Sequence, residues 1–325
     1  MLQTYRNNKC RLSLPKYLCF GLGRERLNGM ENVKVLILGV NGMLGHKLFL
    51  HLSSHEDLHV FGTARKRDAW LKCFPQQLTG NIHFDVNVNN FDSLAEVIHL
   101  VRPDWVINCI GIIKQGVLGQ DYNENIYVNA LFPHKIARIC AEVDARMLHI
   151  STDCVFSGAK GRYLENDVAD GLDLYGRCKL LGEVDYSHCL TLRTSIIGHE
   201  LQSQLGLIEW FLAQRDRTLG FTRHIYSGFP TVELASIIAR YIIPNTWISG
   251  VYHLSSNPIT KYELLKLVAL KYNKEIAIDP YDDTFCDRSL DSSKFRNLTG
   301  FSPPSWPEMI DRMYQDYLSI PYGIR

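Results

Sequence analysis

A tyrosine and a lysine stand four positions apart in the stretch DLYGRCKLLGE, residues 173–183. In a helix this spacing puts Tyr175 and Lys179 on one face, so both side chains can reach into the same cleft. A phenol has a pKa of about 10, and a nearby ammonium stabilises its phenolate, so the pair can exchange a proton with a ketone or alcohol oxygen. The same spacing recurs at Tyr262 and Lys266, and the surroundings must distinguish the two pairs.

Hydroxyl groups that could polarise such a ketone lie upstream, at the end of the stretch RMLHIST, residues 146–152. This apolar run predicts a buried strand, and open α/β sheets bind ligands at the carboxyl ends of their strands. Ser151 and Thr152 are therefore candidates to stand beside the phenol. Tyr262 has no such strand near it, and we interpret that second pair as residues of an ordinary helix face.

Three glycines fall between a predicted strand, residues 33–40, and a predicted helix, residues 43–52, in the stretch GVNGMLG. The first allows a tight turn, the second lets the backbone approach a pyrophosphate, and the third lets the helix pack on the strand with its N-terminus facing the anion. We interpret the motif as a dinucleotide site; the alternative is a glycine-rich turn without a ligand. The predicted cofactor-binding residues here are Gly39, Asn41, Gly42, Met43, Leu44 and Gly45.

The residues after the second predicted strand, 58–63, indicate which dinucleotide is bound. NAD enzymes usually carry an acid there for the ribose 2′-hydroxyl, whereas this chain reads GTARKR, with Arg65 the first of three cations. A guanidinium suits a 2′-phosphate, so the sequence favours NADP(H) over NAD(H); an exposed basic loop is the alternative. Asp85, after the third strand, could accept from the adenine amine or cap a turn. Asn108 and Gly111, at the fourth strand, complete the predicted cofactor site.

Strands alternate with helices through the first part of the chain, which predicts an α/β fold with a doubly wound parallel sheet of the Rossmann type. Shorter elements follow and predict a smaller C-terminal α/β substrate lobe. We expect the NADP-binding domain to span 30–200, with a return around 226–255, and the lobe to span 201–325. Further strands are predicted at 81–86 and 104–111, helices at 93–101, 124–143, 204–214, 231–242, 260–272 and 306–318, and capping boxes at Ser93 with Glu96 and Thr260 with Glu263.

Composition narrows the class of protein further. The 325 residues are 46% hydrophobic with a net charge of +1, so no global field attracts nucleic acid or an acidic membrane. No apolar run is long enough to span a bilayer, and the nine cysteines form no C-x-x-C pair, which favours a reduced cytoplasmic chain without a metal site.

Residues 1–29 are basic and lack periodicity. We expect them to be disordered or not native, with Met30 as the natural start; a targeting segment is the alternative.

Together, the glycine turn, STDCVFSG at 151–158 and YGRCKLLGE at 175–183 resemble the extended short-chain dehydrogenase/reductase family. Within it, the chain is most similar to the dTDP-4-dehydrorhamnose reductase branch, whose members reduce the C4 ketone of nucleotide-linked 6-deoxysugars. The likeness continues through LRTSIIG, SGFPTVELASII and DRSLDSSKF. It implies an NADPH-dependent reductase of a nucleotide-activated 4-ketosugar that makes precursors of cell-surface polysaccharides. A homodimer is an option.

By that resemblance, Thr152 is the hydroxyl beside the substrate ketone, Tyr175 is the acid and base, and Lys179 is its partner, which also holds the nicotinamide ribose. Asn129 corresponds to a helix asparagine that supports the lysine through water. Its alternative role is to satisfy the helix backbone near Pro133.

Three further positions bear on the substrate. Arg288 is a candidate to pair with the diphosphate of a sugar nucleotide, or it forms a surface salt bridge. Arg193 is interpreted as half of a buried structural ion pair. Cys154 is a predicted substrate contact and stands where the branch commonly has a tyrosine. The segment 108–120 also departs from the pattern of the branch, so the hexose could differ, an N-acetylated one being an option.

Two alternatives to a reductase stay open. An epimerase or dehydratase would retain its cofactor and return the hydride within one cycle. Such enzymes usually place an acid beside the hydroxyl, but we expect Asp153 to point away from Thr152 because neighbours on a strand face opposite sides. The branch also resembles the regulatory β subunit of methionine adenosyltransferase, which binds a dinucleotide yet serves as a partner, so the motifs alone cannot prove turnover.

Overall fold

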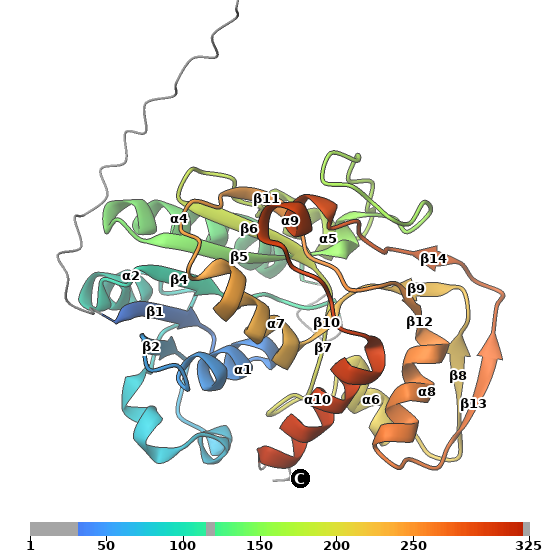
Figure 1. Cartoon of the computed structure of the whole chain (residues 1–325). Helices are drawn as coiled ribbons and strands as arrows, with labels where there is room; N and C mark the ends of the chain where they lie inside the picture. Colours follow the sequence, from blue (N-terminus) through green and yellow to red (C-terminus); the bar gives the residue numbers. More distant parts are fainter. Residues whose placement is uncertain (1–31, 115–120, 321–325) are drawn as a thin grey trace, which may run out of the picture. The chain divides into compact units, whose positions relative to one another are not determined.

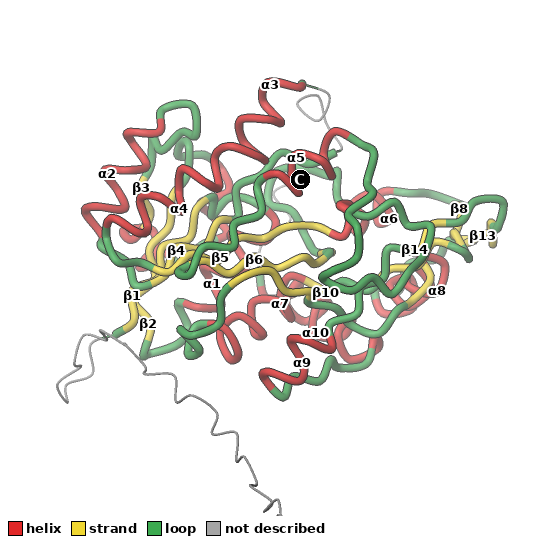
Figure 2. The backbone as a smooth tube through the Cα atoms, turned by 90° about the horizontal axis from the view of Figure 1, so that it is seen from above, coloured by secondary structure: helices red, strands yellow, loops and turns green. Residues whose placement is uncertain are grey.

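The computed structural model describes residues 32–114 and 121–320 (Figure 1). Its centre is a seven-stranded sheet with the order β11-β6-β5-β4-β1-β2-β3, in which every neighbouring pair is parallel. Helices cover both faces of the sheet (Figure 2). This arrangement confirms the predicted doubly wound fold and puts its switch point between β1 and β4, where such sheets bind ligands. The predictions for residues 1–29 lie outside the described residues.

The strands of this sheet are β1 (Val33–Leu38), β2 (Leu58–Thr63), β3 (Ile82–His83), β4 (Trp105–Asn108), β5 (Arg146–Thr152), β6 (Cys189–Thr194) and β11 (Gly250–His253). The α-helices are α1 (Met43–Leu52), α2 (Phe91–Val101), α3 (Tyr122–Asn125), α4 (Phe132–Glu142), α5 (Leu174–Leu181), α6 (Leu207–Ala213), α7 (Thr231–Ile237), α8 (Lys261–Lys271), α9 (Ser293–Thr299) and α10 (Trp306–Ser319). The short strands are β7 (Ile196–Ile197), β8 (Arg217–Phe221), β9 (His224–Tyr226), β10 (Phe229–Pro230), β12 (Ile259–Thr260), β13 (Ala277–Tyr281) and β14 (Cys286–Asp287).

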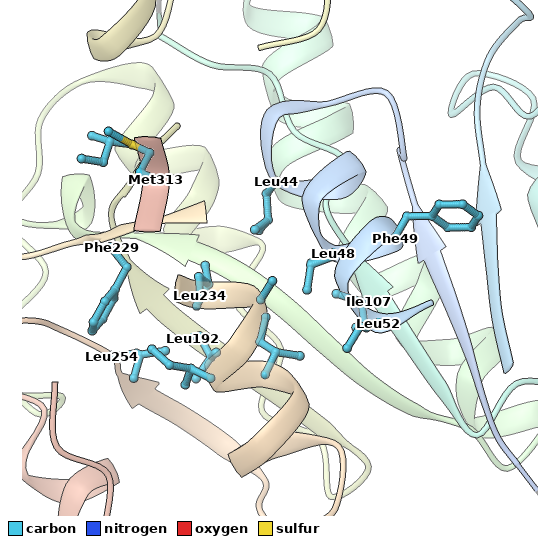
Figure 3. Packing of buried hydrophobic residues seen from close by; sticks show 14 of the residues in the cluster. Leu44, Leu48, Phe49, Leu52, Ile107, Leu192, Phe229, Leu234, Leu254 and Met313 are labelled. Carbon is cyan, nitrogen blue, oxygen red and sulfur yellow. The ribbon is translucent and has the colours of Figure 1, made fainter. Parts of the chain in front are cut away.

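The sheet is buried on both faces, which explains the continuous apolar run of β1. Val35 and Ile37 belong to the core on one face, and Leu36 and Leu38 belong to the core on the other, as the alternation of side chains along a strand requires. Helices α1 and α7 cover the first face, and their leucines pack together there (Figure 3). Helices α2 and α4 cover the second. Each fully buried leucine or isoleucine contributes roughly 1.5–3 kcal/mol.

The helix predicted at 124–143 contains a wider turn. A π-helical segment, Ile126–Leu131, connects α3 to α4. Pro133 accounts for it, because proline has no N–H to donate to the carbonyl four residues earlier, that of Asn129. A Cβ on Gly182, at the end of α5, would collide with this same carbonyl, so the two helices approach closely only with glycine there.

Local side-chain competition corrects one predicted helix start. Helix α2 begins at Phe91, and Ser93 donates to the carbonyl of Asn90 at 2.7 Å instead of capping the helix. The predicted capping box of Ser93 was therefore wrong. The second box is confirmed in α8, where Glu263 N–H donates to Thr260 Oγ1 at 3.0 Å.

Beyond β6 the chain builds elements that stand to one side of the large sheet (Figure 1). We call α6, β8, β9, β12, α8, β13 and β14 the small lobe. Within it β8 pairs with β13 in parallel, and β9 lies between β12 and β14. Between these elements the chain returns to the edge of the large sheet as β11, next to β6. Within the described residues, no helix combines the length and apolar character needed to cross a membrane.

Candidate functional site

The glycine turn between β1 and α1 has the backbone that an anion site requires. Gly39 has a φ of +84°, in the left-handed region that favours glycine. A Cβ on Gly45 would collide with the Gly39 carbonyl, so only glycine lets α1 start this close to the strand. Gly42 is the N-cap of α1, and neither a capping side chain nor an acid occupies the first turn. The N–H groups of that turn are therefore available to a phosphate.

A cavity of about 290 Å³ lies beside the turn, and the three cations after β2 have different surroundings. The Arg67 guanidinium packs 4.1 Å from the centre of the Phe84 ring, and Lys66 Nζ lies 3.8 Å from the Asp68 carboxylate. Among the described residues Arg65 has no such partner, so its guanidinium is available to a ligand. The turn and the cavity together fit a dinucleotide. The residues that line the cavity are Asn41, Arg65, Lys66, Asp68, Trp70 and Gln202.

The other predicted cofactor residues occupy three different settings. Asp85 is exposed after β3, and its carboxylate caps no turn within the described residues. Its φ of +62° is left-handed, which aspartate tolerates better than most residues. Asn108 is buried at the end of β4. Gly111 is exposed, and a Cβ there would lie 3.2 Å from Asn129 Oδ1.

The phenol and the hydroxyl predicted to act on a carbonyl come together at the ends of β5 and α5. Asp173 caps α5 by accepting from Gly176 N–H at 2.8 Å, so the helix begins at Leu174, one residue before Tyr175. A Cβ on Gly176 would collide with the Cys154 carbonyl, so this glycine lets α5 approach the turn after β5. A hydrogen bond then joins Tyr175 to Thr152.

The electrostatics of the phenol differ from the prediction. Burial raises the pKa of Tyr175 above its ordinary value, the neighbouring Cys154 thiol adds to the effect, and the hydrogen bond with Thr152 opposes it. Lys179 is not among the main causes of this shift, and the lowering of the pKa of this phenol by the lysine stays a prediction. The phenol is therefore protonated at neutral pH.

Lys179 is held by the sheet instead. Its Nζ donates to the carbonyl of Ile150 at 2.6 Å and lies 3.3 Å from His149 Nε2. Burial lowers the pKa of Lys179 from 10.5 to about 8, while the charges of Glu183 and Cys109 act in the opposite direction. The amine loses its proton more easily than an ordinary lysine does.

Asn129 connects the π-helical segment to the chain after β4. Its Oδ1 accepts from Ile112 N–H at 3.0 Å, and its Nδ2 donates to the Ile112 carbonyl at 2.9 Å and to Asn125 Oδ1 at 3.0 Å. The side chain thus bonds to the segment after β4 and not to the backbone near Pro133. That alternative was wrong, and support of Lys179 through water stays a prediction.

Asp153 lies beside the hydroxyl, contrary to the prediction from strand alternation. The strand ends at Thr152 and a 3₁₀ turn begins at Asp153, so the alternation no longer applies. Thr152 Oγ1 lies 3.3 Å from the Asp153 carboxylate and accepts from Cys154 N–H at 3.1 Å. Burial raises the pKa of Asp153, and the Arg288 guanidinium partly opposes this.

Arg288 and Cys154 meet at the same edge of the site. Arg288 Nε donates to the Phe156 carbonyl at 2.9 Å, and its Nη1 lies 3.5 Å from Cys154 Sγ. The guanidinium is half-buried and forms no surface salt bridge within the described residues, so that alternative was wrong. Burial raises the pKa of the Cys154 thiol to about 12, which keeps it neutral.

The second tyrosine–lysine pair lies in the small lobe. Lys266 Nζ is 5.2 Å from the centre of the Tyr262 ring, and both line a groove of about 400 Å³ on α8. No residue of the glycine turn or of β5 lines that groove. Over residues 32–114 and 121–320, no group of three or more His, Cys, Asp or Glu side chains could hold a metal ion.

Sequence reasoning missed the groups that surround Lys179. His149 and Ser151 alternate along β5 and so face the same side, where His149 meets Lys179 and Ser151 donates to Glu183 at 2.7 Å. Their partners Lys179 and Glu183 are four residues apart, so these two side chains also face one side. The alternation of His149 and Ser151 is visible in the stretch RMLHIST, but it identifies the partners of Lys179 only when the packing of α5 on β5 is known. The predicted ion pair of Arg193 is confirmed, because it donates twice to Glu183 at 2.8 Å.

The comparisons with known proteins agree with this geometry. A family model described as RmlD substrate binding domain matches residues 33–319. The chain belongs to this family. Membership confirms the resemblance to the dTDP-4-dehydrorhamnose reductase branch of the extended short-chain dehydrogenases/reductases.

Individual relatives include an enzyme and a subunit. Methionine adenosyltransferase 2 subunit beta of Mus musculus is 24% identical over 327 residues, which cover 91% of this chain and 94% of that protein. The dTDP-4-dehydrorhamnose reductase of Aggregatibacter actinomycetemcomitans is 26% identical and covers 68% of this chain and 84% of that protein. The solved structure of dTDP-4-dehydrorhamnose reductase from Bacillus anthracis in complex with NADP is 20% identical. It aligns with a TM-score of 0.71 over 88% of this chain and 99% of that one, and this likeness shows the fold.

Proposed function

We propose that this chain is a nicotinamide-dependent reductase that converts the C4 ketone of a nucleotide-activated 6-deoxy-4-ketosugar into an alcohol. Two features carry the proposal: Thr152 lies beside Tyr175, with Lys179 one turn further along α5, and the glycine turn of the same sheet has an open helix N-terminus. The family and its members named dTDP-4-dehydrorhamnose reductase support the same chemistry. We expect the chain to act in the cytoplasm on precursors of cell-surface polysaccharides.

The side chains of the site would supply the proton of this reaction. A nicotinamide dinucleotide, when bound, supplies the hydride that reaches C4. Thr152 would orient the ketone oxygen, and Tyr175 would transfer its phenolic proton to that oxygen, so that C=O becomes CH–OH. The raised pKa of Tyr175 keeps this proton in place at neutral pH until the oxygen becomes basic. The phenolate then regains a proton from water.

We also propose NADP(H) as the preferred cofactor. The glycine turn would hold the pyrophosphate, and Lys179 would hold the nicotinamide ribose. Arg65 lines the adjoining cavity without a polar partner among the described residues, and a guanidinium there can pair with a 2′-phosphate in two hydrogen bonds. Asp85 would face the adenine.

On the substrate side, Arg288 is proposed to pair with the diphosphate of the sugar nucleotide. Its Nε is already bonded to the Phe156 carbonyl, which orients the guanidinium and leaves further N–H groups for a ligand. Cys154 stands next to it as a neutral thiol, where it can contact the sugar without adding charge.

The deciding experiment follows NADPH absorbance with dTDP-, UDP- and GDP-linked 4-ketosugars, with NADH in parallel. Tyr175→Phe should lose at least ~100-fold in kcat, because it removes the proton donor. Tyr262→Phe is the matched control, since it removes the same hydroxyl from the second pair and should leave turnover unchanged. Equal rates for wild type and Tyr175→Phe would show that this phenol is not the acid. Cofactor retained through purification, with no net NADPH consumption, would indicate an epimerase or dehydratase instead.

A second candidate function follows from the relatives named methionine adenosyltransferase 2 subunit beta, which match along 91% of the chain. On that proposal the chain binds a dinucleotide and serves as the partner of a larger enzyme. Size-exclusion chromatography with a methionine adenosyltransferase catalytic chain should then show one co-eluting complex. The same column run without the partner reports whether the chain forms the homodimer that we propose. Co-elution together with inertness towards every ketosugar would favour the subunit.

A further inference from the structure

A chain of hydrogen bonds runs through the sheet and ends on the lysine of the site. Ile110 N–H lies 3.1 Å from Asn108 Oδ1, and Asn108 Nδ2 lies 3.2 Å from His149 Nδ1. The other ring nitrogen, His149 Nε2, lies 3.3 Å from Lys179 Nζ. Asn108 and His149 are almost completely buried, so water does not compete for these groups.

The direction of every bond in this chain follows from its first member. A backbone N–H can only donate, so Asn108 Oδ1 accepts and Asn108 Nδ2 donates to His149 Nδ1. A ring nitrogen that accepts carries no proton, so the proton of the neutral imidazole is on Nε2. That N–H points to Lys179 Nζ, which can accept only through the lone pair of a neutral amine. A protonated lysine would place two donors against each other.

We propose that His149 is a positioning residue of this site: its Nε2–H donates to Lys179 Nζ and stabilises the neutral form of the amine relative to the ammonium. The amine also donates to the Ile150 carbonyl, and one N–H remains for a cofactor ribose. The use of this lysine in catalysis rests on the proposed function, whereas its titration does not.

The charged and titratable groups around the pair agree with this direction. Cys109, after β4, and Glu183, after α5, face Lys179, and His134 on α4 is the further titratable group near His149. Glu183 favours the ammonium, but its carboxylate is already paired with Arg193. Burial lowers the pKa of His149 well below its ordinary value, so an imidazolium does not form.

The test is a direct titration of the lysine, which needs neither substrate nor cofactor. In protein labelled with ¹³C at the lysine Cε atoms, the Lys179 resonance is the one that Lys179→Met removes. We expect its midpoint near pH 8 in the wild type. In His149→Leu it should lie about one unit higher, because the donor that favours the neutral amine is gone. His199→Leu removes another buried histidine, whose ring bonds to Glu209 and Tyr272, and should leave the midpoint unchanged.

Asn108→Leu supplies a second variant that keeps the imidazole. Without the bond to Nδ1, His149 can move its proton to that nitrogen and accept from an ammonium, so the midpoint should again rise. If His149→Leu does not fold, this variant decides alone. A midpoint that stays the same in the variants that fold, or a wild-type Lys179 that titrates like an exposed lysine, would overturn the proposal. Failure of the reductase assay alone would leave this result intact.

Discussion

Replacing Arg193 by methionine would remove the cation of a buried ion pair behind the site. Arg193 Nε and Nη2 donate to the two oxygens of Glu183 at 2.8 Å, and the side chains are only 8% and 7% exposed. Its Nη1 also donates to the Glu165 carbonyl at 3.3 Å and lies 3.3 Å from His253 Nε2. This pair joins the chain after α5 to β6 and β11.

The magnitude depends on the carboxylate that is left behind. Methionine fills a similar volume but leaves Glu183 buried, with the Ser151 hydroxyl 2.7 Å away as a remaining donor. Leaving one charge of such a pair without its partner costs about 3–5 kcal/mol. Whole proteins are stable by only about 5–15 kcal/mol. We therefore expect a large fall in the denaturation midpoint.

Urea denaturation followed by circular dichroism measures this loss. Arg217→Met is the matched control: Arg217 also makes two hydrogen bonds to one carboxylate, that of Asp279, but the side chains are 73% and 38% exposed. Its loss should lower the midpoint far less, because solvent screens the charges of an exposed pair. Adding Glu183→Gln to Arg193→Met should restore part of the stability, because no charge is then buried alone. Equal losses for Arg193→Met and Arg217→Met would refute the reasoning from burial.

Two further predictions concern the cofactor and the lysine. Arg65→Leu should raise the Kd for NADPH by about tenfold or more, while the Kd for NADH changes little. Arg67→Leu is the control, because the Arg67 cation packs on an aromatic ring. Equal effects of Arg65→Leu on both cofactors would contradict the 2′-phosphate assignment. Lys179 has a pKa lowered from 10.5 to about 8, so the unfolded chain binds more protons between these values and its free energy of unfolding should rise with pH across that window. The gain is about 2.5 pH units at ~1.4 kcal/mol each, roughly 3.5 kcal/mol. Lys179→Met should flatten this rise in urea midpoints measured from pH 8 to 10.5, and equal slopes would count against it.

Several elements near the site could be predicted residue for residue. The helix at 43–52 and the strands at 58–63 and 146–152 have the bounds that their patterns indicate. Their apolar periodicity is strong because the sheet buries both faces of each strand. Predictions failed where a polar side chain competes with the regular pattern, as Ser93 does at the start of α2. They also failed where strand alternation was applied beyond the end of a strand, as it was for Asp153 after β5.

Spacing along the chain was sufficient for the fold class, for the glycine turn and for the placement of Tyr175 and Lys179 on one helix. These features depend on neighbours within one or two turns, and residue types record such neighbours directly. The pKa values of the side chains in the site depend on tertiary packing. Lys179 meets His149 where α5 packs on β5, and burial moves the pKa values of Tyr175 and Lys179, because β4, β5 and α5 bring together groups that are remote in sequence.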